Sequence, residues 1–277
     1  MLRHSPTSNI DKRRARCAAA VMRAMLLWFA VAGSSLAQGV LAKPEPAAPT
    51  PEPMGDCVND AREQLFQDLA GFARYDPANT ALPPPNPREQ RVVFMGDSIT
   101  DFWATVDPKF FARADFIDRG ITGQTTMQML LRFRRDVIAL KPAVVHIMAG
   151  TNDIAGNTGP MDLAGIEANI ASMVDLARAN GIQVVIGSVL PATHFSWRSD
   201  IDPGPKIVAL NEQLKAYSKT NHIIYVDYYA ALTDGTLGIR SEFTSDGVHP
   251  TLPGYLVMDQ LADAAIRAGL RRRVQAR

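Results

Sequence analysis

A serine, a histidine and an aspartate are the residues of this chain whose types and spacing suggest chemistry. Ser98 lies in the segment Gly96-Asp97-Ser98, directly after an apolar run, while Asp246 and His249 stand three residues apart far downstream. A serine hydroxyl becomes a good nucleophile when a histidine takes its proton and a carboxylate orients that histidine. The sequence therefore supplies the parts of a nucleophilic serine site, provided that the fold brings them together.

Apolar runs alternate with amphipathic stretches along the chain, and these elements must position the three residues. We expect strands at residues 91–95, 114–118, 143–148, 183–189 and 223–227, and helices over 125–140, 162–180, 206–220 and 254–269. A further helical pattern covers residues 58–75. The strands read as continuous apolar runs, which is typical of parallel strands buried on both faces. This pattern predicts the α/β class, as a three-layer α/β/α sandwich around a five-stranded parallel sheet.

Polar clusters follow the predicted strands at their carboxyl ends, where ligands bind in an open parallel sheet. The clusters are residues 96–98, 120–126, 150–153 and 191–205, and residues 246–250 lie in the loop before the last helix. We therefore expect Ser98, Asp246 and His249 to share one rim of the sheet.

Four of these segments resemble the four sequence blocks of the SGNH hydrolases, the GDSL-type esterase superfamily. The matching segments are Gly96-Asp97-Ser98 for the nucleophile, residues 119–124 with Gly123, residues 150–153 with Asn152, and residues 246–249 with Asp246 and His249. Ile99 stands where the superfamily's name has a leucine, which is a common variation. The resemblance covers about residues 60–268 and implies the flavodoxin-like SGNH hydrolase fold, without a cofactor.

The resemblance implies a role for each matched residue. Ser98 would be the nucleophile, His249 the general base and then the general acid, and Asp246 the residue that orients His249. The backbone N–H groups of Ser98 and Gly123 and the Asn152 side chain would form the oxyanion hole. A helix cap at Ser98, a turn at Gly123 and a capped loop at Asp246 are the structural alternatives. Four blocks in order favour the catalytic interpretation.

Residues 123–126 and 149–155 resemble one branch of the superfamily, that of platelet-activating-factor acetylhydrolase catalytic subunits and bacterial carbohydrate esterases. This likeness implies that the serine esterase acts on short acyl groups, acetyl above all, on a small-molecule or carbohydrate ester. Phe195 and Trp197, in the loop after the fourth strand, offer aromatic surface for a sugar ring, unless they only pack that loop. Asp97 is a further candidate for substrate binding, with a hydrogen bond around its own turn as the alternative.

Other functions stay open at this point. A lysophospholipase or thioesterase-like acyl hydrolase would need an apolar channel for a longer acyl chain. A non-catalytic glycan-binding module would have no need of an intact triad. Transfer of the acyl group to an alcohol would use the same acyl-enzyme as hydrolysis. The sequence sets neither the acyl group, the alcohol nor the oligomeric state.

Residues 1–42 have the pattern of a secretory signal peptide. A positive region at residues 12–16 precedes an apolar stretch, and small residues allow cleavage after Ala37 or Ala42. Arg23 limits the clean apolar run to about a dozen residues, fewer than the ~20 that cross a bilayer, so an uncleaved anchor is less favoured. We expect an exported protein, periplasmic or extracellular, with no transmembrane segment in the mature chain.

Composition and charge set the remaining expectations. Residues 43–57 read as a proline-rich tether, residues 58–270 as the catalytic domain and residues 271–277 as a basic tail. Without residues 1–42 the chain has 23 basic and 27 acidic residues, so we expect no nucleic-acid partner. Cys57 is the single cysteine left, which excludes an internal disulfide. No set of His, Cys and carboxylate residues has metal-ligand spacing, so we expect no metal.

Overall fold

The structure, a computed structural model, describes residues 66–86, 90–113 and 115–275. The chain from Asp68 onwards forms one compact unit. The signal peptide and the proline-rich tether, predicted at residues 1–42 and 43–57, lie outside the described residues and stay predictions.

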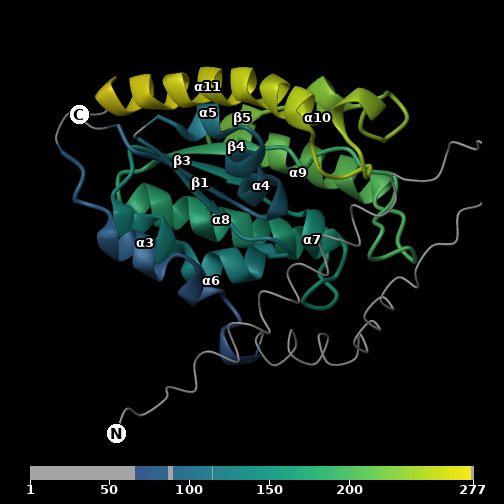
Figure 1. The fold of residues 1–277 in the computed structure, drawn as a ribbon, viewed down its shortest axis with the longest axis horizontal. Helices are drawn as coiled ribbons and strands as arrows, with labels where there is room; N and C mark the ends of the chain where they lie inside the picture. Colours follow the sequence, from purple (N-terminus) through teal and green to yellow (C-terminus); the bar gives the residue numbers. More distant parts are fainter. Residues whose placement is uncertain (1–65, 87–89, 114, 276–277) are drawn as a thin grey trace, which may run out of the picture. The chain divides into compact units, whose positions relative to one another are not determined.

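Five parallel strands form the central sheet, as the sequence predicts (Figure 1). The strands are β1 (Val92–Gly96), β2 (Phe116–Gly120), β3 (Val144–Met148), β4 (Gln183–Gly187) and β5 (Ile224–Val226). Their order is β2-β1-β3-β4-β5, the doubly wound order of flavodoxin-like folds. Ligands of such folds bind at the carboxyl end of the sheet where the strand order reverses, which here is beside β1.

Helices cover both faces of the sheet and complete the predicted three layers (Figure 1). One face carries α6 (Thr126–Asp136), α8 (Leu163–Ala179) and α9 (Gly204–Thr220). The other carries α4 (Ser98–Val106), α5 (Pro108–Phe111), α10 (Tyr228–Leu232) and α11 (Leu252–Gln275), the yellow helix along the top of Figure 1. Shorter elements are η2 (Phe72–Arg74), α3 (Asp76–Ala81), η3 (Ile138–Leu140), α7 (Thr151–Ile154) and η4 (Ser241–Phe243).

Successive residues of β1 contribute to two separate hydrophobic cores. Val93 and Met95 pack in the core with α6, α8 and α9, whereas Val92 and Phe94 pack in the core with α4 and α11. Each fully buried side chain of this size stabilises the fold by about 1.5–3 kcal/mol. A strand buried on both faces is held rigidly, which fixes the position of the residues that follow it.

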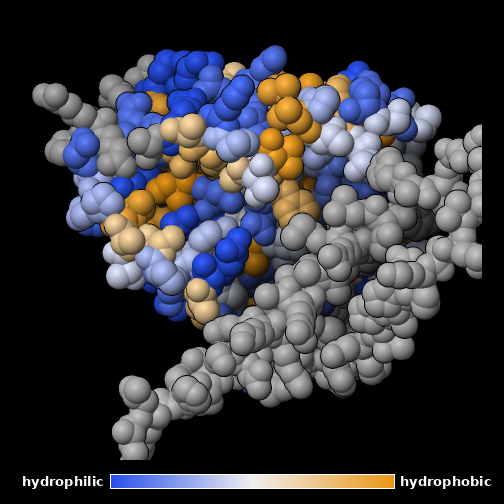
Figure 2. Space-filling model, viewed as in Figure 1, coloured by the Kyte–Doolittle hydropathy of each residue, from blue (hydrophilic) through white to orange (hydrophobic). Residues whose placement is uncertain are grey.

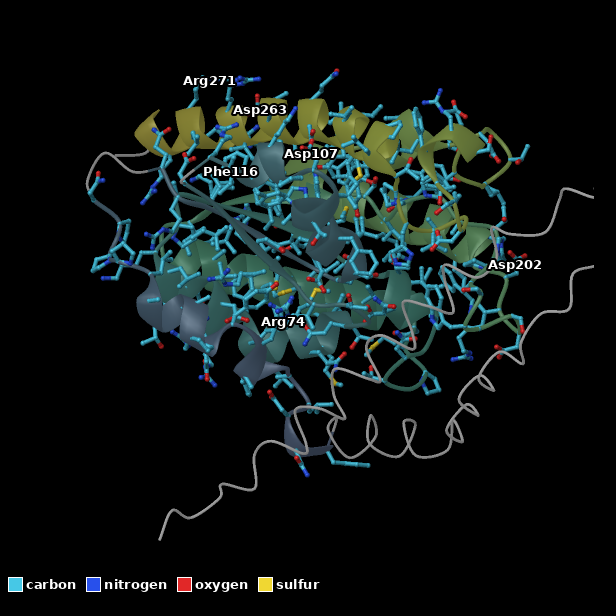
Figure 3. All side chains as sticks on the ribbon, in the orientation of Figure 1. Arg74, Asp107, Phe116, Asp202, Asp263 and Arg271 are labelled. Atoms are coloured by element: carbon cyan, nitrogen blue, oxygen red, sulfur yellow. The ribbon has the colours of Figure 1, made fainter. Side chains whose placement is uncertain are left out.

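Aromatic side chains anchor α4, the helix that begins at Ser98, against the sheet. The Phe94 ring lies 5.8 Å from the Trp103 ring and 5.2 Å from Phe116, which is labelled in Figure 3. Trp103 also donates from Nε1 to Asp259 Oδ1 of α11 at 2.8 Å. Aromatic pairs add about 0.5–1.5 kcal/mol each beyond their buried area. This cluster therefore holds α4 against the sheet and against α11.

The first and last predicted helices differ from the observed ones. In its described part, the helix predicted over residues 58–75 ends at Gln67, and Gly71, with φ 67°, lies in the turn that precedes η2 and α3. Glycine adopts the left-handed conformation at little cost, so the chain can turn at Gly71 before η2 begins. The last helix is longer than predicted, because α11 continues through Arg271 to Gln275 and takes in residues expected in a tail.

Figure 2 shows one face of the molecule, on which hydrophilic side chains surround smaller apolar groups. Exposed large apolar side chains in the described ranges include Trp197, Leu252 and Leu256. No helix among the described residues is long and apolar enough to cross a membrane.

Candidate active site

Ser98 is the first residue of α4 and follows β1 after a single residue, Asp97. Asp97 caps the helix, because its side chain accepts a hydrogen bond from the Ile99 N–H at 3.0 Å. The Ser98 N–H belongs to the first helical turn, where N–H groups have no acceptor within the helix. Within the described part of the chain this N–H has no hydrogen-bond partner, so it is available to a ligand.

The Ser98 hydroxyl meets the His249 ring, and the ring meets Asp246. Ser98 Oγ lies 2.9 Å from His249 Nε2, and His249 Nδ1 lies 2.7 Å from Asp246 Oδ2. At these distances the histidine can take the hydroxyl proton while the carboxylate holds the ring. The fold thus brings together the three residues whose types first suggested a nucleophilic site.

The loop before α11 holds Asp246 in place. Asp246 Oδ1 accepts hydrogen bonds from the backbone N–H groups of Val248 at 2.9 Å and His249 at 2.8 Å. Burial would raise the pKa of Asp246, but hydrogen bonds from the His249 ring and backbone outweigh it and hold that pKa well below its usual range. Asp246 is therefore a carboxylate throughout the neutral pH range and suited to orient His249.

Gly123 lies in the loop between β2 and α6 with φ 80°. A Cβ at this position would approach only Asn157 Nδ2, at 4.0 Å, so the backbone conformation and not lack of space favours glycine. Among the described residues, the Gly123 N–H also has no hydrogen-bond partner. It is the second free backbone donor at this rim.

Asn152, in α7 after β3, supplies a side-chain donor beside the first two. Its Nδ2 donates to the Gln124 carbonyl at 3.1 Å and approaches Asp97 Oδ2 at 3.4 Å. These contacts place the Asn152 amide between the loop of Gly123 and the turn of Ser98. The predicted oxyanion donors therefore lie on neighbouring segments of one rim.

Two carboxylates that the sequence did not single out anchor the loop around Gly123. Asp101, one turn after Ser98 in α4, accepts from the N–H of Thr122 at 3.2 Å and from its hydroxyl at 2.7 Å. Asp153 accepts from the N–H of Thr126 at 3.0 Å and from its hydroxyl at 2.6 Å. The loop is therefore fixed on both sides of Gly123.

Arg132 of α6 is fully buried and joins the turn before Ser98 to the same loop. Its guanidinium donates to the Gly96 carbonyl at 3.1 Å, to Gln124 Oε1 at 2.6 Å and to Asp136 Oδ2 at 3.1 Å. Sequence reasoning missed this residue. The available signal was its place three residues after Met129 and next to Phe133, where helical spacing predicts burial, so that a charge there marks a special site.

Two aromatic rings flank His249. Phe102, not anticipated from the sequence, has its ring 5.2 Å from the histidine ring, and Trp197 lies 6.4 Å away on the loop after β4. Phe195 stacks on Trp197 with ring centroids 4.9 Å apart. The two rings give the rim an apolar border.

The three substrate-binding candidates differ in exposure. Trp197 is 41% exposed, whereas Phe195 is 0% and Asp97 2% exposed. Burial also raises the pKa of Asp97 to about 6, against the opposing effect of the Ile99 N–H bond. Phe195 and Asp97 therefore have no surface to offer a substrate, and they support Trp197 and the Ser98 turn instead.

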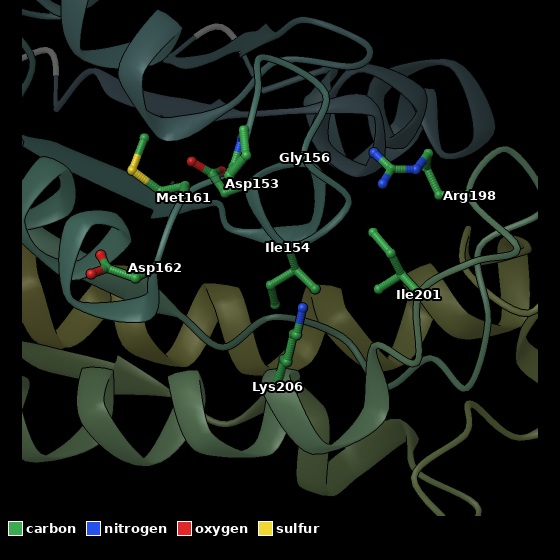
Figure 4. A pocket seen from close by; sticks show the side chains of 9 residues that line it. Asp153, Ile154, Gly156, Met161, Asp162, Arg198, Ile201 and Lys206 are labelled. Atoms are coloured by element: carbon green, nitrogen blue, oxygen red, sulfur yellow. The ribbon is translucent and has the colours of Figure 1, made fainter.

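A cavity of about 770 Å³ lies between residues that follow Asn152 and Trp197 in the chain, among them Asp153 and Arg198 (Figure 4). Its lining residues are Asp153, Ile154, Gly156, Pro160, Met161, Asp162, Arg198, Ile201 and Lys206. None of Ser98, Asp246 and His249 lines it, so it is distinct from the rim where these three meet. Within the described ranges, no group of three or more His, Cys, Asp or Glu side chains is placed to hold a metal ion.

A flavodoxin-like sandwich with a serine and a histidine in contact at its carboxyl rim is the architecture of the SGNH hydrolases. The model of the GDSL-like lipase/acylhydrolase family matches residues 94–257, and the chain belongs to this family. The protein is therefore an esterase or acylhydrolase.

Three relatives illustrate this membership. A GDSL-like lipase of Bacteroides thetaiotaomicron with a crystal structure is 48% identical, with a TM-score of 0.71, and the match covers 73% of this chain and 99% of that one. Esterase TesA of Pseudomonas aeruginosa is 27% identical over 180 residues, covering 59% of this chain and 81% of the relative. An acetylxylan esterase of Geobacillus stearothermophilus is 24% identical over 203 residues, covering 61% of this chain and 90% of the relative.

Proposed function

We propose that this protein is an exported serine esterase that hydrolyses short acyl esters, acetyl esters of carbohydrates above all. The observation that carries the proposal is the continuous contact from Ser98 Oγ to His249 Nε2, at 2.9 Å, and from His249 Nδ1 to Asp246 Oδ2, at 2.7 Å. This is the geometry of an activated nucleophile and its oriented base.

The reaction proceeds through an acyl-enzyme. Ser98 Oγ attacks the ester carbonyl carbon while His249 takes the hydroxyl proton, and the carbonyl oxygen becomes an oxyanion. The Ser98 and Gly123 N–H groups and Asn152 Nδ2 donate to that oxyanion. His249 then protonates the leaving alcohol, and water, deprotonated by the same ring, attacks the acyl-Ser98 ester to release the acid.

Two observations favour a short acyl group and a carbohydrate alcohol. The chain is similar to an acetylxylan esterase over most of that relative's length. The exposed face of Trp197 beside His249 is a suitable platform for a sugar ring at the place where the alcohol must leave. The substrate is accordingly a small-molecule or carbohydrate ester.

A panel of p-nitrophenyl esters from acetate to decanoate, with acetylated xylo-oligosaccharides, tests the proposal. We expect the highest kcat/KM on acetate and acetate release from the sugar esters, both lost in Ser98→Ala. Higher kcat/KM on octanoate than on acetate would support a lysophospholipase or thioesterase-like activity instead. Hydrolysis that persists in Ser98→Ala would overturn the serine mechanism. If the wild type hydrolysed none of these esters, the result would favour a non-catalytic glycan-binding module.

Export is tested on the full chain. We expect the protein expressed in a bacterium to reach the periplasm or medium with an N-terminus that follows Ala37 or Ala42. A full-length protein retained in the membrane fraction would show an uncleaved anchor instead.

A further inference from the structure

The side chain of Asn157, in the loop after α7, is hydrogen-bonded to three residues of the site at once. Its Nδ2 donates to Asn152 Oδ1 at 2.8 Å and to the Gly123 carbonyl at 3.1 Å, and its Oδ1 accepts from Trp197 Nε1 at 3.2 Å. Both amide hydrogens and the amide oxygen are therefore used. The Asn157 backbone N–H also donates to the Asn152 carbonyl at 3.0 Å, and this bond holds the Asn157 backbone against the end of α7.

The bond to Asn152 decides which way that amide faces. An asparagine amide can present either its oxygen or its nitrogen to a ligand after a half-turn of the side chain. Because Asn157 donates to Asn152 Oδ1, the oxygen is held away and Nδ2 is directed towards Gln124 and Asp97, the side of Ser98. A reversed amide would present an oxygen to the oxyanion and repel it.

The bond to Gly123 holds the second donor. Asp101 fixes Thr122 on one side of Gly123, and Asn157 fixes the Gly123 carbonyl on the other. Glycine at φ 80° has other conformations within reach, and of these contacts the one from Asn157 is made to Gly123 itself, next to its N–H. Asn157 therefore touches two of the three oxyanion donors.

The third bond connects these donors to the ring that borders His249. We propose that Asn157 is a positioning residue. Through it, binding of the substrate's alcohol part over the Trp197 ring affects the orientation of the oxyanion donors. The inference rests on the proposed function, because it needs Ser98 chemistry at this rim. Asn157 is exposed in the free protein, and a bound alcohol over Trp197 would exclude the water that competes for these hydrogen bonds.

Two substitutions of Asn157 separate the loss of its hydrogen bonds from the effect of an added charge. Asn157→Asp keeps the acceptor for Trp197 and removes both donors, and Asn157→Leu removes all three bonds without adding charge. We expect each to lower kcat on p-nitrophenyl acetate about 100-fold, the usual effect of a lost oxyanion donor, with KM within about threefold. Circular dichroism and thermal unfolding confirm that the variants fold.

Asn180→Asp is the matched control, because it makes the same change at an exposed asparagine that ends α8 before β4, at the amino end of the strands and away from the carboxyl rim. We expect wild-type kcat from it. A kcat within threefold of wild type in Asn157→Leu would overturn the inference, even if Asn157→Asp were slow, since added charge alone would then explain the loss.

Coupling to Trp197 is tested by a double-mutant cycle with Trp197→Phe, which keeps a ring and removes the N–H. We expect Trp197→Phe to lower kcat on p-nitrophenyl acetate about tenfold when Asn157 is present, and to leave it unchanged in the Asn157→Leu background. On ethyl acetate, whose alcohol part is small, we expect Trp197→Phe to have little effect on kcat. Equal effects in both backgrounds would overturn the coupling.

A fluorophosphonate probe keeps the two proposals distinguishable. Labelling of Ser98 with unchanged kcat in both Asn157 variants would overturn only the inference. A wild type that neither hydrolyses esters nor reacts at Ser98 would overturn the proposed function and the inference together.

Discussion

Ser98 Oγ and His249 Nε2 lie within hydrogen-bonding distance, 2.9 Å, although 151 residues separate them in the chain. Ser98 is held by the end of β1, the strand at the point where the strand order reverses. His249 is held by the loop before α11, the helix that covers the same face as α4. Packing of α4 and α11 against one core therefore sets the distance between the two atoms.

Substitution of Asp246 should slow catalysis with little effect on substrate binding. Asp246→Asn keeps the shape but favours the wrong His249 tautomer, so we expect kcat to fall about 10⁴-fold while KM changes little. Steady-state kinetics on p-nitrophenyl acetate measure both parameters. A loss smaller than tenfold would show that Asp246 only caps its loop.

Substitution of Asn152 should remove one oxyanion donor. We expect Asn152→Ala to lower kcat about 10²–10³-fold, because the donor acts on charge that develops only in the transition state. A rise in KM at constant kcat would contradict this expectation and indicate a role in ground-state binding.

Because its pKa is raised, Asp97 should make the free energy of unfolding depend on pH between about 4 and about 6. Its folded-state pKa is about 6, above the usual value of 3.8, so between these values the folded protein binds the extra proton. The contribution of Asp97 to stability is therefore full below pH 4 and falls as pH rises to about 6.

Asp97→Asn removes this titration. We expect the variant to gain stability over the wild type as pH rises from 4 to 7, by up to about 3 kcal/mol. Urea unfolding of both proteins at several pH values measures the difference. Parallel stability curves over this range would contradict a raised pKa at Asp97.

Arg132 should be important for stability as well as for the site. Arg132→Met leaves Asp136 buried without its cation, which costs about 3–5 kcal/mol of unfolding free energy. Arg135→Met is the matched control in the same helix, since the exposed Arg135–Asp76 pair contributes at most about 1 kcal/mol. Equal losses of unfolding free energy in the two variants would show that the buried Arg132–Asp136 pair stabilises the fold no more than the exposed pair.

Several elements could be predicted from the sequence because their causes are local. Apolar runs indicated four of the five strands to within a few residues, whereas the second strand was indicated by Phe116 and Ile117 alone, between two aspartates. The helix boundaries were less certain, since Gly71 and the end of α11 depend on contacts and backbone conformations that periodicity does not encode. Phe195 and Trp197 looked alike in the sequence, and only packing separated the buried ring from the exposed one.

The sequence by itself determined the fold class, the family and the residues that could do chemistry, because the blocks around Ser98 and His249 are short, ordered and local. The tertiary structure alone decided which further side chains support them. Arg132 reaches the Gly96 carbonyl across 36 residues, and Asn157 reaches the Gly123 carbonyl across 34. Such contacts depend on how loops that follow different strands pack together at one rim. The pattern of residues along the chain does not specify that packing.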